Sequence, residues 1–321
     1  MSGIAVLVEH RSGAVRDVTL ELLAAARKLA GETGGGVEAI LLSSSCGPLA
    51  ESLKGQWDRL VCAERPAFTE YNYESYQRAL LKYIAERKPS ALLVAHTAFG
   101  IDLAPSLAVA ANCALVSDAT ALARGDGGLL VTRGMYSGKL CADWMARGET
   151  VLVMVRQSNF KPEAAGLAAE RVAWDPGEVA AQKTKFITLE EVPTIGVDIT
   201  KATVVIAVGR GVKEEKNLAP IRELAESLGA VLAASRPVVD AGWLPKEVQV
   251  GSSGKTVKPK LYIALGISGA FQHVAGMKGA EMVIAVNKDP KAPIFASAHY
   301  GIVEDLHKVV PILRARIKEL R

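Results

Sequence analysis

Residues 261–277 read LYIALGISGAFQHVAGM, and this is the most informative stretch of the chain for its fold class. The apolar run 261–265 predicts a buried strand, and Gly266 and Gly269 predict a tight turn directly after it. Ser268 is placed to cap the helix that follows. A helix N-terminus behind a glycine turn presents backbone N–H groups and the positive end of the helix dipole. The stretch therefore predicts a strand, a turn and a helix that together form an anion site.

Three other apolar runs of the C-terminal part predict strands, at 203–208, 231–234 and 282–286. Polar or glycine residues follow each of them, in the segments Gly209-Arg210-Gly211, Ser235-Arg236 and Asn287-Lys288-Asp289-Pro290. Taken singly, each segment could be an ordinary turn. Because ligands bind at the carboxyl ends of the strands in open α/β sheets, the segments together predict one binding site.

The N-terminal part repeats the strand–helix alternation. Strands are expected at 4–8, 37–42, 59–62 and 91–95, and helices at 18–29 and 76–86. Strands at 129–133, 139–144 and 150–156 would close or extend that sheet. The fold class predicted is α/β, with an N-terminal parallel-sheet domain and a C-terminal doubly wound domain.

The domain junction is expected in the polar, proline-containing stretch that ends near residue 197. This gives an N-terminal domain over 1–192, a linker over 193–202 and a second domain over 203–321. A final helix is expected at about 303–320, with a kink at Pro311.

Composition excludes several classes of protein. The net charge of the 321 residues is only +4 and no long basic run occurs, so nucleic acid is not an expected partner. No stretch approaches 18 apolar residues and the start lacks the features of a signal peptide, so a cytoplasmic chain without membrane insertion is expected. The four cysteines form no CxxC pair and no metal-ligand spacing, which predicts reduced thiols and no metal site.

One motif is misleading. Residues 251–256, GSSGKT, end like a phosphate-binding loop, but Gln249 stands where that motif needs its first glycine. Pro259 and a strand follow in place of a helix, so nucleotide hydrolysis is not expected. No GxGxxG follows a strand either.

A series of short motifs extends from Gly209 toward the C-terminus: SR (235–236), VDAG (239–242), QVG (249–251), LYIA (261–264), GISGA (266–270), QH (272–273), AGMK (275–278), NKDP (287–290), APIF (292–295), YG (300–301) and DL (305–306). In this order they resemble the α subunit of electron-transfer flavoproteins. The N-terminal part resembles that family loosely, through SDAT at 117–120. The resemblance implies a C-terminal FAD-binding domain and a β subunit that contacts the N-terminal domain.

The resemblance also implies which residues bind FAD. They are Arg210, Ser235, Arg236, Gln249, Val250, Gly251, Ser252, Ser253, Gly266, Ile267, Ser268, Gly269, Ala270, Phe271, Gln272, His273, Asn287, Asp305 and Leu306. Arg236 is expected to lie over the isoalloxazine, where a permanent cation, together with a donor such as His273, stabilises negative charge. The sequence departs from the family at Ser252 (usually Gln), Phe271 (usually a smaller aliphatic residue) and His299 (usually Asp).

The implied function is electron transfer without catalytic residues of its own. Electrons would pass from dehydrogenases, for example of the acyl-CoA dehydrogenase type, to a respiratory or other redox acceptor. One alternative is the α subunit of an electron-bifurcating complex whose β subunit holds a second FAD. A nucleotide-binding enzyme acting alone on CoA or adenylate substrates needs a nucleophile or acid/base pair in the first domain, and no GxSxG occurs there. A redox-inactive interaction subunit would have lost Arg236 or the glycine turn, and both are present.

Overall fold

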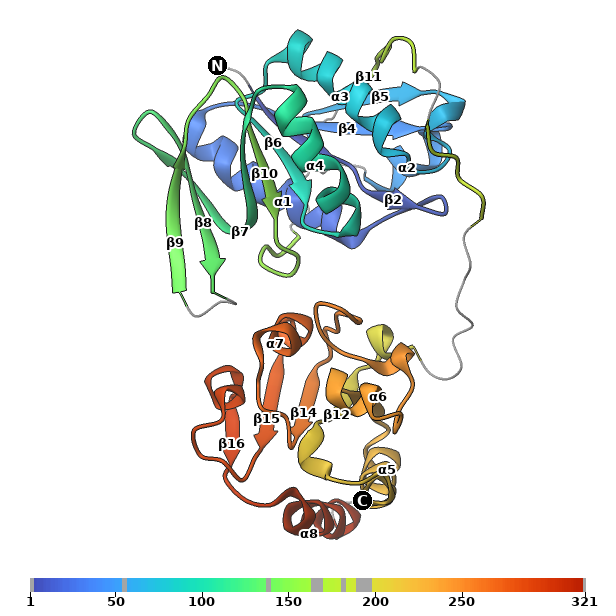
Figure 1. Ribbon diagram of the computed structural model, residues 1–321, viewed down its shortest axis with the longest axis vertical. Coiled ribbons are helices and arrows are strands. Elements are labelled where there is room, and N and C mark those ends of the chain that lie inside the picture. Colours follow the sequence, from blue (N-terminus) through green and yellow to red (C-terminus); the bar gives the residue numbers. More distant parts are fainter. Residues whose placement is uncertain are drawn as a thin grey trace. The chain divides into compact units, whose positions relative to one another are not determined.

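The structure is a computed structural model that describes residues 3–53, 57–136, 140–162, 170–179, 183–188 and 198–319. The chain forms two compact units, Met1–Leu189 and Glu190–Arg321, each with its own sheet (Figure 1). The linker is expected at 193–202, and its residues 193–197 lie outside the described residues. Its last residues carry a short 3-10 helix, η2 (Ile199–Lys201).

The N-terminal unit is built on a nine-stranded sheet in the order β11-β5-β4-β1-β6-β10-β7-β8-β9. The strands from β11 to β7 are parallel, and β8 and β9 continue the sheet in antiparallel pairing. The bounds are β1 (Ile4–Leu7), β4 (Val37–Ser43), β5 (Arg59–Glu64), β6 (Ala91–Ala95), β7 (Ala114–Gly125), β8 (Gly128–Met135), β9 (Leu140–Ala146), β10 (Val151–Val155) and β11 (Glu170–Ala173). A small hairpin, β2 (His10–Arg11) with β3 (Ala14–Val15), follows β1.

Helices cover both faces of the parallel part, which explains why its strands are continuous apolar runs. In β1, Ile4 and Val6 share a core with helix α1 (Asp17–Thr33) and α2 (Gly47–Ser52). Ala5 and Leu7 point to the opposite core, which contains α3 (Tyr73–Arg87) and α4 (Ala98–Ala110). A short 3-10 helix, η1 (Pro66–Phe68), precedes α3.

The strand–helix rhythm predicted from the sequence is confirmed, and the structure adds elements that the sequence pattern did not reveal. Helix α4 contains Gly100 and Pro105, which obscure its helical signal, yet the Thr97 hydroxyl caps it by accepting from the Gly100 N–H at 3.3 Å. The long strand β7 was likewise not predicted. Strands β8, β9 and β10 do extend the sheet, as expected.

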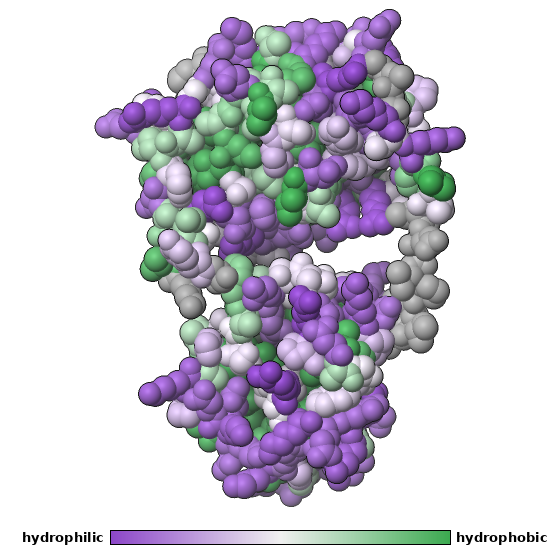
Figure 2. Space-filling view, in the orientation of Figure 1, coloured by the Kyte–Doolittle hydropathy of each residue, from purple (hydrophilic) through white to green (hydrophobic). Residues whose placement is uncertain are grey.

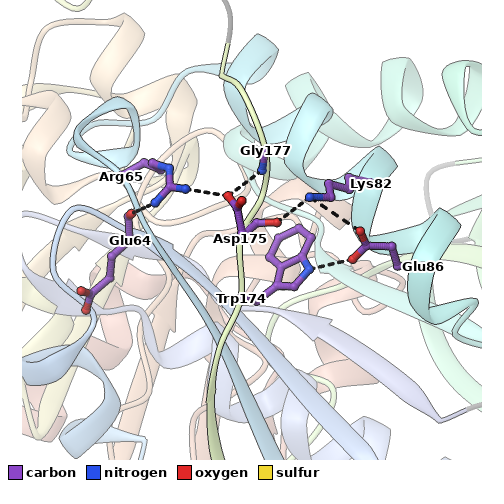
Figure 3. A network of polar contacts seen from close by, with 7 residues as sticks. All are labelled: Glu64, Arg65, Lys82, Glu86, Trp174, Asp175 and Gly177. Carbon is purple, nitrogen blue, oxygen red and sulfur yellow. Dashed lines mark hydrogen bonds and ion pairs between the residues drawn. The ribbon is translucent and has the colours of Figure 1, made fainter.

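Polar contacts hold β11 at the edge of the N-terminal sheet (Figure 3). The guanidinium of Arg65 donates to the carboxylate of Asp175 at 2.6 Å, and the Lys82 ammonium donates to the Asp175 carbonyl at 2.9 Å. The indole of Trp174 donates to Glu86 at 2.9 Å. The segment after β11 is therefore tied both to β5 and to α3.

The C-terminal unit is a doubly wound parallel sheet in the order β13-β12-β14-β15-β16. Its strands are β12 (Val204–Val208), β13 (Val231–Ala234), β14 (Leu261–Leu265), β15 (Met282–Val286) and β16 (Tyr300–Ile302). Helices α5 (Ala219–Leu228) and α8 (Leu306–Glu319) share one core, with the short α6 (Arg236–Asp240). Helix α7 (Phe271–Met277) contributes Met277 to the core on the other face. Besides η2, the described part of this unit has the 3-10 helices η3 (Arg210–Val212), η4 (Glu215–Leu218), η5 (Lys246–Val248) and η6 (Pro293–Ser297).

Two details of the expected C-terminal fold were wrong. Helix α8 begins at Leu306, not at residue 303, because the Asp305 carboxylate accepts from the His307 N–H at 2.9 Å and so caps the helix there. Ser268 does not cap α7: the N-cap residue is Ala270, without a side-chain hydrogen bond. The glycine turn therefore extends two residues further than expected.

Candidate functional site

A cavity of about 660 Å³ lies at the carboxyl ends of the C-terminal strands. In this sheet β13 lies on one side of β12 and β14 on the other, so the chain order reverses at β12, which is where open α/β sheets bind ligands. The lining residues are Arg210, Gly211, Lys213, Ser235, Arg236, Pro237, Gln249, Val250, Gly251, Ser253, Gly266, Ile267, Ser268, Ala270, Gln272, His273, Val286, Asn287, Lys288, Asp305 and Leu306.

Most of the residues predicted from the sequence are thus brought together in one cavity. The exceptions are Ser252, Gly269 and Phe271, which the lining does not include. Gly269 serves the turn, since its φ is +88° and a Cβ there would meet the Ile294 nitrogen at 2.1 Å. Lys213 and Lys288 line the cavity although they were not predicted. Their position just after β12 and β15 was the available signal.

Two glycines let the loops after β12 and β14 touch backbone to backbone. The N–H of Gly211 donates to the Gly266 carbonyl at 3.0 Å. A Cβ on Gly266, whose φ is +63°, would lie 2.8 Å from the Gly211 Cα and 2.7 Å from Leu306 Cδ2. Only glycine fits this position, which keeps the floor of the cavity open to a ligand's approach.

The charged side chains around the cavity favour an anionic ligand. Arg210, Lys213, Arg236 and Lys288 line it against the single carboxylate of Asp305. The backbone N–H that caps α8 and the nearby cations hold the pKa of Asp305 below its ordinary value. The guanidinium of Arg236 is 70% exposed, with its Nε 3.4 Å from Asp240. Such a loosely held cation can pair with a bound anion.

His273 is the buried titratable group of the cavity wall, with 6% of its surface exposed. Its Nε2 lies 2.9 Å from the Tyr262 hydroxyl, which is itself completely buried. Burial lowers the pKa of His273 to about 4, against a smaller opposing effect of the Val250 backbone. The imidazole is therefore neutral at physiological pH and can offer a hydrogen bond rather than a charge.

Hydrogen bonds fix the loop between β13 and β14. The Gln249 amide donates to the Ser253 hydroxyl at 3.0 Å, and the Ser252 N–H donates to the Gln272 carbonyl at 2.8 Å. Gly251 has a φ of +146°, and a Cβ there would lie 2.9 Å from that same carbonyl. The segment that resembles a phosphate-binding loop is therefore a loop packed on α7, and β14 follows it.

Two polar residues discussed above are engaged with the protein itself. Asn287 donates from Nδ2 to the Ile267 carbonyl at 2.8 Å and accepts from the Asp289 N–H at 3.0 Å. It thereby joins the end of β15 to the glycine turn. The ring Nδ1 of His299 accepts from the Val283 N–H at 3.0 Å, and His299 is not part of the cavity lining.

The N-terminal sheet reverses its chain order at β1, between β4 and β6. Protein side chains fill this position. The Thr97 hydroxyl donates to the Glu9 carboxylate at 2.7 Å, and burial raises the pKa of Glu9 above its ordinary value. Nearby, Arg156 donates from Nε to Asp118 Oδ1 at 2.6 Å and from Nη2 to Oδ2. This cluster was not predicted, although Glu9 and Thr97 follow the ends of the predicted strands 4–8 and 91–95.

Two kinds of feature do not occur in the described part of the chain. Within those ranges, no group of three or more His, Cys, Asp or Glu is arranged to hold a metal ion. Among the helices described, none is long and apolar enough to cross a membrane.

Comparison with known proteins gives matches over nearly the whole chain. The family model for the electron transfer flavoprotein domain matches residues 4–191, and that for the electron transfer flavoprotein FAD-binding domain matches residues 198–278. The chain is 36% identical to the electron transfer flavoprotein subunit alpha of Bacillus subtilis, covering 99% of this chain and 98% of the relative. It is 37% identical to the protein FixB of Clostridium saccharobutylicum, covering 99% and 97%. It is 39% identical to the subunit LctC of a lactate dehydrogenase (NAD(+),ferredoxin) of Acetobacterium woodii, covering 98% of this chain and 77% of the relative.

Proposed function

Because this chain belongs to the electron transfer flavoprotein family as an α subunit, we propose that it takes electrons from a dehydrogenase onto FAD and delivers them to a separate redox acceptor. Its residues 198–278 match the FAD-binding domain of the family. The observation that carries the proposal is the cationic cavity at the strand ends of this unit.

The residues present fit FAD. The cavity volume, about 660 Å³, lies within the range of roughly 300–1,000 Å³ that is typical of cofactor sites. Gly211 and Gly266 leave room on its floor that a Cβ would fill. Several cations face the cavity, as a pyrophosphate requires.

Each part of the cavity has a proposed role. When bound, FAD supplies a ring system that takes up and releases electrons. Arg210, Lys213 and Lys288 would hold the phosphates, and Arg236 would place a permanent positive charge near the ring. His273 would offer a neutral N–H. The other predicted contacts, Ser235, Ser253 and Asp305 among them, remain proposals of the same kind.

The Bacillus subtilis relative is named a subunit alpha, and we propose that this chain also pairs with a β subunit. In Figure 2 hydrophobic residues gather on the N-terminal unit, over the side of the sheet that leads to β7, β8 and β9. Exposed apolar side chains occur on β9 and beside it: Tyr136 is 74%, Leu140 59% and Trp144 47% exposed. Since β9 ends the sheet, it offers both apolar side chains and a strand edge to a partner.

We further propose that the unit up to residue 192 makes this partner contact and that the unit from residue 203 carries FAD, with 193–202 as the linker. The extents of the two family models support this division. Acyl-CoA or other flavin dehydrogenases are the proposed electron donors.

Co-expression and purification of the chain with a β subunit of the family tests both parts of the proposal. The complex should be yellow and should release FAD on denaturation. Trp144→Ala should weaken the pairing, whereas Val109→Ala, at an 84% exposed position on α4, should leave it unchanged. A folded, colourless complex that does not take up FAD would contradict the proposed function.

A second candidate function follows from the similarity to LctC, which belongs to a lactate dehydrogenase that uses NAD(+) and ferredoxin. The chain could serve a bifurcating complex with a second FAD in the β subunit. The flavin content decides between the two: one FAD for each pair indicates a simple carrier, and two indicate bifurcation.

A further inference from the structure

Tyr262 lies behind the cavity wall, in the middle of the buried side of β14. None of its surface is exposed, and its ring packs in the core between the sheet and α7. Burial raises the pKa of its phenol well above the ordinary value, so the hydroxyl keeps its proton. The hydrogen bond recorded for this hydroxyl joins it to His273 Nε2 at 2.9 Å.

Hydrogen-bond accounting decides which nitrogen of His273 carries the proton. A neutral imidazole has one N–H donor and one acceptor nitrogen. If Nε2 carried the proton, the Tyr262 hydroxyl would accept it, and the buried phenolic O–H would need another acceptor. If Nδ1 carries the proton, the phenol donates to Nε2 and both groups are satisfied. Leaving a buried donor unpaired costs about 1–3 kcal/mol, so the tautomer with the proton on Nδ1 is favoured.

The second ring nitrogen of His273 is then a donor available to the cavity. Nδ1 is buried and has no hydrogen-bond partner among the described residues. The Val250 backbone lies close enough to the ring to oppose part of the lowering of its pKa, but no hydrogen bond of normal geometry joins it to Nδ1 among the described residues. Val250 and His273 both line the cavity. A buried donor without a partner at a cavity wall indicates that a ligand acceptor completes it.

We propose that Tyr262 is a positioning residue of the flavin site: by donating to Nε2 it holds the His273 ring in the tautomer whose Nδ1–H faces the ligand. This inference rests on the proposed function. Tyr262 does not itself line the cavity and acts only through His273. It fixes both the orientation of the ring and the identity of the donor, which the phenylalanine ring of Tyr262→Phe could not do.

The first test uses the unaltered FAD-loaded complex labelled with ¹⁵N-histidine. The two ring nitrogens of His273, assigned by their absence from His273→Gln, should report a proton on Nδ1 and an acceptor Nε2. A proton on Nε2, or on both nitrogens, at neutral pH would overturn the proposal. This result does not depend on any variant folding correctly.

The second test compares Tyr262→Phe with Tyr83→Phe. Tyr83 is also fully buried, and its hydroxyl donates to Glu38 at 2.5 Å in the N-terminal unit, so its variant loses a comparable buried hydrogen bond away from the cavity. Tyr262→Phe should make the His273 tautomer mixed, shift the flavin potential in the same direction as His273→Gln, and weaken FAD binding about threefold to tenfold. Tyr83→Phe should change none of these quantities.

The outcomes separate the two levels of inference. If Tyr262→Phe lowers stability but leaves the tautomer and the potential as in the unaltered protein, Tyr262 is only a core residue and the proposal fails. If the unaltered complex binds no flavin, the proposed function fails, while the tautomer measured in that protein still tests the hydrogen-bond argument.

Discussion

The two sheets of this chain both reverse their chain order at one strand, and they use that position in opposite ways. In the N-terminal unit Thr97 binds Glu9 there, and Arg156 binds Asp118 at the ends of neighbouring strands. In the C-terminal unit glycines occupy the equivalent loops, and the cation Arg236 is held only loosely. A parallel sheet therefore supplies a place for a ligand, but the residues after the strands decide whether it stays open.

The largest effect on FAD binding is expected from a substitution that narrows the cavity of the C-terminal unit. Gly266→Ala places a Cβ against the Gly211 backbone in a left-handed conformation, a strain of on the order of 3 kcal/mol. We expect FAD binding, measured by flavin titration of the apoprotein, to weaken about a hundredfold. Gly229→Ala is the matched control, because Gly229 has a similar φ of +61° and open space around its Cβ position. Equal flavin affinities in the two variants would contradict the role given to Gly266.

The buried groups of the two sites should respond to pH in opposite directions. His273 has a folded pKa of about 4, below the ordinary pKa of 6.5, so the unfolded chain binds more protons between these values. The stability of the apoprotein is complete above pH 6.5 and is lost as pH falls toward 4. The loss is on the order of 3 kcal/mol. Urea unfolding between pH 6.5 and 4 should show a smaller loss in the free energy of unfolding for His273→Gln than for the unaltered protein. Equal losses in the two proteins would refute this prediction.

Weakening the Asp118–Arg156 pair of the N-terminal unit should lower the stability of that unit and leave FAD binding unchanged. Asp118→Asn removes the charge that binds Arg156, whereas asparagine tolerates the left-handed backbone at this position, where φ is +62°. We expect the free energy of unfolding of the N-terminal unit to fall by about 1–3 kcal/mol. The measurement is urea denaturation followed by hydrogen exchange of β7 and β10. A loss of bound FAD with unchanged stability would contradict the stabilising role given to this pair.

A smaller effect, on the reduction potential of the flavin, is expected from removing the exposed cation Arg236 at the cavity of the C-terminal unit. Arg236→Ala removes a positive charge that is held by Asp240 alone among the ion pairs described. A cation near the flavin favours its reduced, negatively charged forms. We expect a lower reduction potential, by about 60 mV for about 1.4 kcal/mol in a one-electron couple. Lys258→Ala, remote from the cavity lining, is the control. An unchanged potential with FAD bound would show that Arg236 does not face the ring.

The smallest effect concerns Glu9. Because burial raises its folded pKa above the ordinary value, the folded state holds the proton more tightly. Stability is complete at low pH and decreases as pH rises through the folded pKa. Glu9→Gln keeps an acceptor for the Thr97 hydroxyl and should lack this decrease. The difference between the free energies of unfolding of the unaltered protein and Glu9→Gln, followed against pH, measures this decrease. A difference that grows toward acid pH would contradict the prediction.

Local patterns in the sequence predicted most of the buried strands and the glycine turn. Apolar runs such as 261–265 and 282–286 were predicted because a strand buried on both faces needs apolar residues throughout, a local property. The glycine turn after β14 was predicted for a similar reason, since positive φ selects glycine. Helix α4 was not predicted, because Gly100 and Pro105 weaken its local signal and packing against the sheet stabilises it. The strand-end segments predicted the place of the site, and the resemblance to the family supplied its further residues, such as Asp305 and Leu306.

How these local elements act together depends on tertiary packing. The residues after β12, β13, β14, β15 and β16 are far apart in the sequence and meet because parallel pairing places all carboxyl ends at one edge. In the sequence Tyr262 is simply one apolar residue of a strand, and its hydroxyl gains a role only because α7 brings His273 to 2.9 Å from it. Likewise, Asp118 and Arg156 become a pair through the pairing of β7 with β10. Hydrogen bonds and charges act over a few ångströms, so the partners they join are set by the packing of distant segments rather than by their order in the chain.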